Sequence, residues 1–204
     1  MTEVPLSWEP PRPERADAAR NRRQLLDTAR LMLAEAGPDN LTMDALAERS
    51  GLGKGTVFRR FRTRAGIFQA LLDDSERELQ QHVLSGPPPL GPGAPPIERL
   101  IAYGRARVAW LFRNRDVARF TLDGRQPIPG PAQAPASQIH IQVLLREMSL
   151  PGVNLGLLAV QLTAALDGPL LLYLSAGTLT AGRDDAEREL GAAWQNLVER
   201  VCRP

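Results

Sequence analysis

Basic side chains are concentrated in one short stretch of a chain that is otherwise close to neutral. From Arg49 to Arg64 the sequence has six basic residues and no acidic one, whereas the next sixteen residues hold four acids and one arginine. The whole chain of 204 residues carries a formal net charge of +2. A local cationic surface on a near-neutral chain is typical of proteins that bind nucleic acid phosphates. From charge alone, a solvated face with no partner is an equal alternative.

Two short helices separated by a glycine turn are predicted to carry these basic residues. Thr42 is a suitable N-cap for the first helix, because its hydroxyl can accept a hydrogen bond from a free backbone N–H. The turn at residues 51–53 ends that helix, and a second one is predicted over residues 54–61. Thr63 then caps a long amphipathic helix. This order is the layout of a helix-turn-helix, whose second helix enters the major groove of DNA.

The glycines of this segment also suggest a phosphate-binding loop, but two positions argue against one. Glu48 stands where such a loop has its first glycine, and Gly55 rather than Ser or Thr follows Lys54. A dinucleotide-binding glycine motif does not fit either, because Thr56 takes the place of the third glycine and no strand precedes it. The glycines are therefore interpreted as part of the helix-turn-helix.

The spacing of these residues resembles that of the TetR-type bacterial transcriptional repressors. The DNA-binding signature of that family is followed by Thr42-x-Asp44-x-Leu46-Ala47-x-x-Ser50-Gly51-Leu52-x-Lys54-Gly55-Thr56-Val57-Phe58-x-x-Phe61. The strong resemblance covers about residues 15–75. It implies an all-α fold, with an N-terminal three-helix DNA-binding domain followed by a larger helical domain for ligand binding and dimerisation.

The resemblance also implies which side chains meet double-stranded DNA. Thr42 would touch a phosphate, and Arg64 would take the phosphate-binding role of a family lysine. Small residues at the start of the second helix would allow the DNA to approach closely. Gly53 stands where the family usually has a serine that caps the second helix. Phe58 stands where the family usually has a tyrosine whose hydroxyl donates to a phosphate. The predicted DNA-binding residues are Thr42, Met43, Lys54, Gly55, Thr56, Phe58, Arg59, Arg60 and Arg64.

Proline clusters divide the chain into parts. Fourteen of the 18 prolines lie at residues 5–13, 87–96 and 127–135, and proline restricts φ and lacks an N–H donor. About nine helices are predicted in total, including one over residues 16–36, and no strand alternation or internal repeat is present. The expected parts are a flexible arm at 1–14, the DNA-binding domain at 15–62, a connecting helix at 63–86, and a ligand-binding and dimerisation domain at 97–204.

Apolar periodicity predicts the helices of the C-terminal part. One begins at Ile97, and a separate short helix is expected over residues 116–122. The last two are an apolar helix with a break at Gly168-Pro169 and an amphipathic helix, and their stripes face either a second copy or their own core. The helices after residue 122 are expected at 136–150, 154–177 and 184–202. The predicted homodimer interface is Leu190, Trp194, Leu197 and Val201.

A small, often apolar effector is implied for this C-terminal domain by the same resemblance. Aromatic and methionine side chains line many such pockets, although most residues of these types belong to cores. Ligand and DNA would have to prefer different states of one dimer. The candidate ligand-binding residues are Tyr103, Trp110, Phe120, His140, Met148 and Tyr173.

Several classes of protein are disfavoured by the composition. The longest apolar run, Leu170–Leu174, is far below the roughly 18 residues of a membrane span. The first thirty residues hold no signal-peptide core, so a cytoplasmic protein is expected. A single cysteine, Cys202, excludes an internal disulfide and a cysteine-cluster metal site, and no cofactor is expected. No catalytic triad or paired-carboxylate motif is present, so an enzyme is the weakest alternative, behind a ligand-independent regulator or architectural DNA-binding protein.

Overall fold

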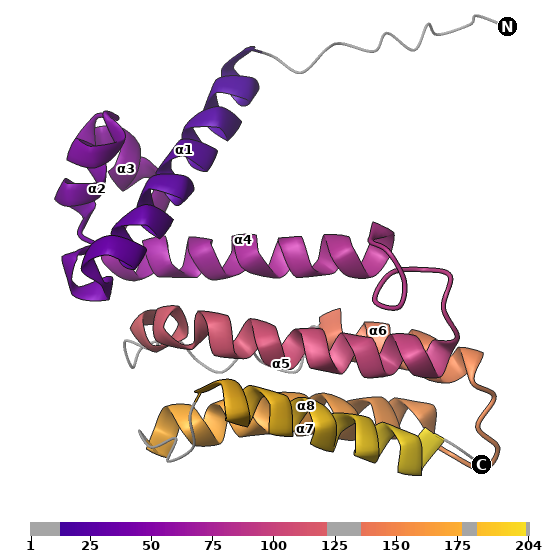
Figure 1. Cartoon of the computed structure of the whole chain (residues 1–204). Helices are drawn as coiled ribbons and strands as arrows, with labels where there is room; N and C mark the ends of the chain where they lie inside the picture. The colour runs from indigo at the N-terminus through magenta and orange to yellow at the C-terminus, as the bar shows by residue number, and fades with distance from the viewer. Residues whose placement is uncertain (1–12, 122–135, 177–182, 203–204) are drawn as a thin grey trace, which may run out of the picture. The chain divides into compact units, whose positions relative to one another are not determined.

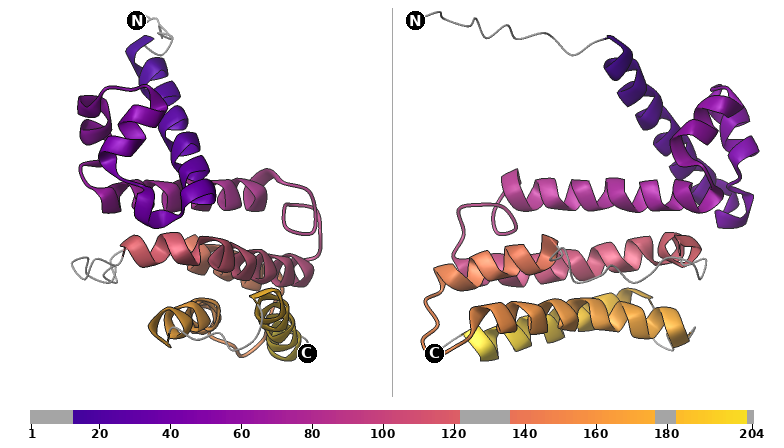
Figure 2. Two further views of the ribbon diagram at one scale, coloured as in Figure 1. Left: turned by 60° about the vertical axis from the view of Figure 1, so that its left-hand side comes forward. Right: turned by 180° about the vertical axis from the view of Figure 1, so that it is seen from behind.

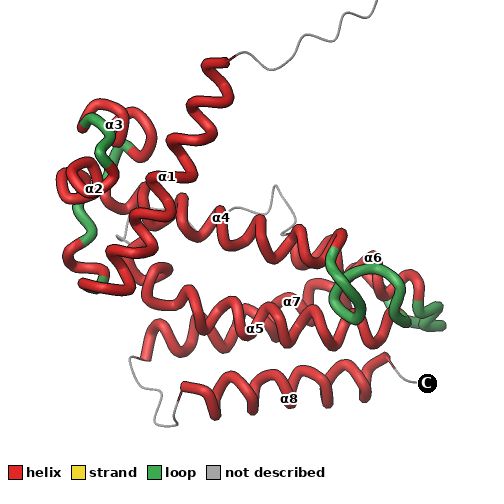
Figure 3. Tube along the Cα trace, turned by 45° about the horizontal axis from the view of Figure 1, so that its top comes forward, coloured by secondary structure: helices red, strands yellow, loops and turns green. Residues whose placement is uncertain are grey.

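In a computed structural model of the chain, residues 13–121, 136–176 and 183–202 are described. These ranges form eight α-helices and one short 3-10 helix, and they contain no β-strand (Figures 1 and 3). The predicted all-α class is confirmed, although the described helices number eight rather than about nine. The chain divides into two compact units, Met1–Leu71 and Leu72–Pro204. Within the described ranges, no helix has the length and apolar character that a membrane span requires.

The first unit is built from α1 (Pro13–Ala36), η1 (Pro38–Asn40), α2 (Met43–Ser50), α3 (Lys54–Phe61) and the first turns of α4 (Arg64–Ser85). α2 packs on α1 and on α3, as Figure 2 shows. The four α-helices each contribute apolar side chains to one small core, because each presents them at helical spacing. The core residues include Leu25, Ala29, Leu41, Leu46, Val57, Phe61, Ile67 and Phe68.

Side-chain caps and a glycine set the bounds of these short helices. The backbone N–H of Ala45 donates to Oγ1 of Thr42 at 3.1 Å, and the N–H of Gly66 donates to Oγ1 of Thr63 at 3.1 Å. Both predicted N-caps are thereby confirmed. Gly51 ends α2 with a φ of 68°, a left-handed conformation that favours glycine.

The second unit contains the rest of α4 together with α5 (Pro96–Thr121), α6 (Ala136–Glu147), α7 (Leu155–Ala176) and α8 (Arg183–Cys202). α5 lies beside α8 and also packs on α6 and α7, while α6 packs on α7 (Figure 1). The core lies between these helices. Its most buried members include Leu100, Tyr103, Ile141, Leu144, Leu145, Ala159, Leu162 and Val198.

A glycine allows α5 and α8 to approach closely. The indole Nε1 of Trp194 donates to the carbonyl of Leu100 at 3.0 Å. A Cβ added to Gly104 would lie 1.9 Å from that same Nε1 atom. Trp194 is only 4% exposed, so its indole fills the space that the glycine leaves open.

The separate short helix expected over residues 116–122 is wrong, because α5 continues without a break to Thr121. Residues 113–116 form a polar run within this helix. No glycine or proline occurs between Gly104 and Thr121, and Asn114 donates its side-chain amide to the carbonyl of Trp110 at 2.9 Å. A polar stretch alone does not end a helix that has packed neighbours on both sides.

The break expected at Gly168-Pro169 is also wrong, because α7 runs through it to Ala176. Proline removes one N–H donor from a helix and usually kinks or ends it. On the preceding turns Leu162 and Leu166 are each 2% exposed. Their burial against the neighbouring helices favours a continuous helix over the loss of one hydrogen bond.

Candidate DNA-binding surface

α3 buries its apolar side chains and exposes its basic ones. Val57 is fully buried and Phe61 is 5% exposed. Arg59 and Arg60 are exposed away from this apolar stripe, and Lys54 is exposed at the N-terminal end of the helix. The predicted apolar face is confirmed, and the exposed part of α3 is a cationic surface formed by Lys54, Arg59 and Arg60. Phe58 joins this surface with half of its area exposed.

Two further predicted residues, Thr42 and Met43, stand at the N-terminus of α2. Thr42 is exposed and caps the helix, while Met43 is half-buried. Thr56 is half-buried on the first turn of α3. Because the N-terminus of a helix presents free N–H groups and a positive dipole end, both of these helix starts suit an anion.

Gly53 and Gly55, at the start of α3, are not required by the packing of the unit. A Cβ added to either glycine would meet no atom within 4 Å, and neither has the positive φ that favours glycine. Glycine within a helix costs roughly 1 kcal/mol relative to alanine. The small size of these residues therefore leaves open space on the outside of the molecule rather than inside it.

Arg64, the third arginine predicted to meet DNA with Arg59 and Arg60, is engaged within the first unit. Its Nε donates to the carbonyl of Leu41 at 2.8 Å, and its Nη2 donates to that of Pro38 at 2.6 Å. The sequence did not predict these hydrogen bonds, because both acceptors are backbone atoms more than twenty residues away.

Sequence reasoning also missed two residues that join α1 to the end of α2. Nε2 of Gln24 donates to the carbonyl of Ser50 at 2.8 Å. The Ser50 side chain is buried, and its Oγ accepts from the N–H of Leu52 at 3.3 Å. These hydrogen bonds hold the turn between α2 and α3 against α1. The only signal was the small polar residue before the glycine turn.

Among the candidate ligand residues of the second unit, Tyr103 and His140 lie together. Their ring centroids are 4.7 Å apart, and the hydroxyl of Tyr103 donates to Oγ of Ser137 at 2.6 Å. Burial, assisted by the charge of Arg99, lowers the pKa of His140 to about 4. Burial also raises the pKa of Tyr103. Both side chains are therefore neutral near pH 7.

The other candidate ligand residues are more scattered. Trp110 is 9% exposed, and the guanidinium of Arg107 lies over its ring, 4.5 Å from the centroid. Met148 is half-buried at the margin of the core. The side chains of Phe120 and Tyr173 fall outside the described part of the chain.

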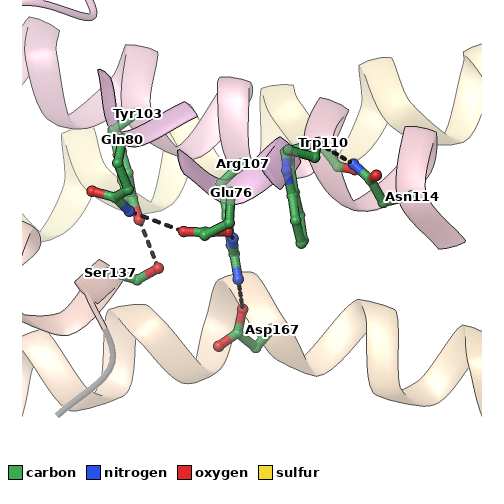
Figure 4. Close-up of polar contacts among 9 residues, drawn as sticks. Glu76, Gln80, Tyr103, Arg107, Trp110, Asn114, Ser137 and Asp167 are labelled. Atoms are coloured by element: carbon green, nitrogen blue, oxygen red, sulfur yellow. Dashed lines mark hydrogen bonds and ion pairs between the residues drawn. The ribbon is translucent and has the colours of Figure 1, made fainter. Parts of the chain in front are cut away.

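A polar network that the sequence did not predict connects α4, α5 and α7 near these aromatic residues (Figure 4). Nη1 of Arg107 donates to Oε2 of Glu76 at 2.5 Å, and Nη2 lies 3.6 Å from Oδ1 of Asp167. Nε2 of Gln80 donates to Oε1 of Glu76 at 2.9 Å. Burial raises the pKa of Asp167, whereas Arg107 acts in the opposite direction. No pattern in the sequence pairs these three charges, because they come from three separate helices.

A groove also lies between α4 and α5. Its volume is about 500 Å³, within the roughly 300–1,000 Å³ of small-molecule sites. Trp110 is the one candidate ligand residue among those that line it. The lining residues are Ser75, Glu78, Leu79, His82, Leu90, Ala106, Trp110, Arg113 and Asn114.

The candidate dimer residues on α8 differ in what they expose. Trp194 belongs to the core of its own unit, and Leu190 and Leu197 are half-buried against that core. Only Val201, which is 37% exposed, offers a large apolar side chain to a partner. Trp194 therefore has almost no surface available for a second copy. On α7, by contrast, Leu157 and Val160 are 62% and 46% exposed.

Comparisons with known proteins agree with the arrangement of the first unit. A family model described as bacterial regulatory proteins, tetR family, matches residues 25–71. The HTH-type transcriptional repressor Rv1474c of Mycobacterium tuberculosis is 42% identical over 60 residues, which are 29% of this chain and 32% of that repressor. The match thus spans about a third of the relative's length. Both findings name regulatory proteins, and neither names an enzyme.

Solved structures extend the likeness to most of the chain, at the level of the fold. A protein described as a TetR-family transcriptional regulator from Mesorhizobium loti has a TM-score of 0.61 at 17% identity, over 90% of this chain and 97% of that one. SmeT in complex with triclosan has a TM-score of 0.54 at 16% identity, over 89% and 90% of the two chains. The helix-turn-helix of the first unit is thus similar to the DNA-binding part of the TetR family of bacterial regulatory proteins, whose model matches residues 25–71.

Proposed function

We propose that the protein is a transcriptional repressor that binds a near-palindromic DNA operator as a homodimer and is released by a small effector. The observation that carries this proposal is the exposed face of α3. Arg59 and Arg60 are exposed on that face with the half-exposed ring of Phe58, and Lys54 is exposed at the N-terminal end of the helix. A recognition helix needs an apolar face for its own core and a polar, cationic face for the major groove.

The open space beside Gly53 and Gly55 supports the same proposal. A glycine that serves no packing or backbone purpose lets another molecule come close to the helix backbone. The first turn of α3 would thus accept a phosphate, as helix N-termini do. Thr42 and Met43 at the start of α2 are proposed to contact the adjacent backbone, while Arg59 and Arg60 are the proposed readers of base edges.

A homodimer follows from the size of the DNA-binding surface. One short helix makes few contacts, whereas a two-fold dimer places two recognition helices on half-sites spaced by about 34 Å or a multiple of it. The exposed Leu157 and Val160 on α7, with Val201 on α8, are the apolar side chains that we assign to this interface. A stable interface buries at least about 1,200 Å² in total.

A neutral or apolar effector is proposed for the second unit. Tyr103 and His140 are uncharged near pH 7 and lie in contact, and Trp110 reaches the groove between α4 and α5. SmeT, which shares the fold, was solved with the small molecule triclosan. A ligand that prefers one state of the dimer would change the DNA affinity of that dimer by the same coupling free energy.

The salt dependence of DNA binding tests the core of this proposal. Log affinity should fall with log salt, with a slope of about −0.9 for each phosphate that a cation neutralises. Replacing Lys54, Arg59 and Arg60 together by alanine should weaken binding. It should also make the slope less steep, by the contribution of up to about three neutralised phosphates. The matched control is Arg146→Ala, an exposed basic residue on α6. An unchanged slope in the triple variant would remove α3 from the DNA contact.

A further inference from the structure

We infer that Arg64 acts as a positioning residue that holds the entry to α2 in place, and that its own contact with DNA phosphate is not its main role. The inference rests on the proposed DNA-binding function. Arg64 is the first residue of α4, and both of its backbone acceptors lie in the segment before α2. Pro38 begins η1, and Leu41 is the residue directly after it.

The geometry uses the shape of the guanidinium as well as its charge. Nε and Nη2 donate to two different carbonyls at 2.8 and 2.6 Å, which requires donors held in a rigid planar fork. The ring of Phe68 lies below the group, 5.5 Å from Cζ to the centroid, and Phe68 is 1% exposed. The carboxylate of Asp39 is 3.9 Å away but 90% exposed, so it adds little.

The two carbonyls are close in sequence to the residues that start α2. Leu41 is fully buried, and the next residue, Thr42, is the N-cap of α2. The N–H of Leu46 donates to the carbonyl of Thr42 at 3.0 Å. A hydrogen bond to Leu41 therefore orients the peptide that leads into the cap. Through this peptide Arg64 sets the position of Thr42, which we propose meets a phosphate.

A positioning role and a phosphate-binding role predict different behaviour for a lysine at this position. A lysine keeps the positive charge, so it should preserve a phosphate contact. Its single ammonium cannot reproduce two N–H donors in a planar fork. If Arg64 positions the turn, Arg64→Lys should fail in the same way as Arg64→Ala.

The experiment compares wild type, Arg64→Lys and Arg64→Ala on duplexes recovered by selection from a random DNA pool. We expect both variants to bind about fivefold more weakly, which corresponds to the loss of a helix cap worth about 1 kcal/mol. The salt slope should stay that of the wild type in both. A lysine variant with wild-type affinity, together with an alanine variant whose slope is flatter by about one unit, would overturn the inference.

A double-mutant cycle separates positioning from general destabilisation. Thr42→Ala should itself weaken binding, and Arg64→Lys combined with Thr42→Ala should weaken it no further, because both act on one cap. If instead the two effects multiply, Arg64 does not act through Thr42 and the inference fails. Thermal melting of each variant, with Arg146→Ala as the control, identifies any variant that does not fold.

Hydrogen exchange tests the same inference without DNA. In both Arg64 variants the amides of Ala45 and Leu46 should exchange faster than in wild type, whereas the amide of Val198 in the second unit should not change. Unchanged exchange at α2 would contradict the positioning role. If the wild-type protein bound no DNA at all, the proposed function would fail, while this exchange measurement would still decide the role of Arg64 in the turn.

Discussion

Nζ of Lys54, the first residue of α3, lies 2.7 Å from Oδ1 of Asp44 on the first turn of α2. Both side chains are about two-thirds exposed, at 70% and 68% of their area. Exposed ion pairs contribute between about 0 and 1 kcal/mol. The pair therefore joins the two helices of the helix-turn-helix only weakly. A phosphate, which carries more charge than a carboxylate, can displace Asp44 from Lys54.

Asp44→Asn should strengthen DNA binding. The substitution removes a carboxylate next to the proposed phosphate-binding surface and frees Lys54, so we expect up to about fivefold higher affinity, the equivalent of about 1 kcal/mol. Fluorescence anisotropy with a labelled duplex measures the change. Glu189→Gln, an exposed acid on α8, is the control and should have no effect. Weaker binding by Asp44→Asn would mean that the ion pair is needed to shape the surface.

Gly55→Ala should affect stability and DNA binding in opposite directions. Alanine is the better helix former, and its Cβ meets no protein atom, so the free energy of unfolding should rise by up to about 0.5–1 kcal/mol. The same methyl group would occupy the space proposed for the DNA backbone, and affinity should fall at least tenfold, more than about 1.4 kcal/mol. Thermal melting and anisotropy provide the two measurements.

The control for this glycine is Gly191→Ala in α8, where an added Cβ would make only an ordinary 3.5 Å contact with Arg105. That variant should be stabilised or unchanged and should bind DNA like wild type. A Gly55→Ala protein with full DNA affinity would show that the open space at α3 has no functional use.

The predicted DNA-binding helices could be read from the sequence because their signals are local. A capping threonine, a left-handed glycine and an apolar pair one turn apart fixed α2 and α3, and residues 54–61 were placed without error. The contacts of Arg64 and Gln24 could not be read in this way, because their acceptors are backbone carbonyls that only the tertiary fold brings near. A side chain that binds a distant carbonyl leaves no pattern in the sequence.

Leu157→Glu with Val160→Glu on α7 should convert a dimer to monomers. Both side chains are exposed in the single chain, so the substitutions leave its core intact, whereas charges buried between two copies would be costly. Sedimentation equilibrium measures the mass. Leu84→Glu is the control, because Leu84 is 71% exposed at the end of α4. A double variant that remains dimeric would place the interface elsewhere.

Trp194 is unsuitable for that test, although its apolar stripe predicted an interface. Glycine at position 104 and tryptophan at position 194 are far apart in sequence, and only the packing of α5 on α8 reveals that they fit together. Gly104→Ala should therefore destabilise the second unit by about 1–3 kcal/mol or more, as overpacking does. Urea unfolding measures this. A Gly104→Ala protein with wild-type stability would contradict the observed packing.

His140 should make stability depend on pH in a defined window. Its pKa is lowered from 6.5 to about 4 by burial and by the charge of Arg99. Between these two values the unfolded chain binds a proton that the folded chain does not, so stability is fully present above about pH 6.5 and falls toward pH 4. His140→Leu should flatten this part of the profile in urea unfolding. An equally steep profile in the variant would show that other groups cause the loss.

The predicted ends of α7 and α8 agree with the structure to within one residue, whereas α6 ends three residues earlier than predicted. A break was also expected in α7 at Pro169 and another near residue 116 of α5. Burial of neighbouring turns overrides these local signals. The network of Glu76, Arg107 and Asp167 was missed for a related reason, since charge partners on three helices become neighbours only after packing.

Selection of bound duplexes from a random DNA pool tests whether the exposed face of α3 reads a DNA sequence. We expect the wild-type protein to enrich a near-palindromic sequence, with half-sites about one helical turn apart or a multiple of that distance. A protein with Arg59 and Arg60 replaced by alanine should enrich a different or weaker consensus. If the wild-type protein enriches no sequence and binds no duplex even at low salt, the exposed face of α3 is not a DNA-binding surface.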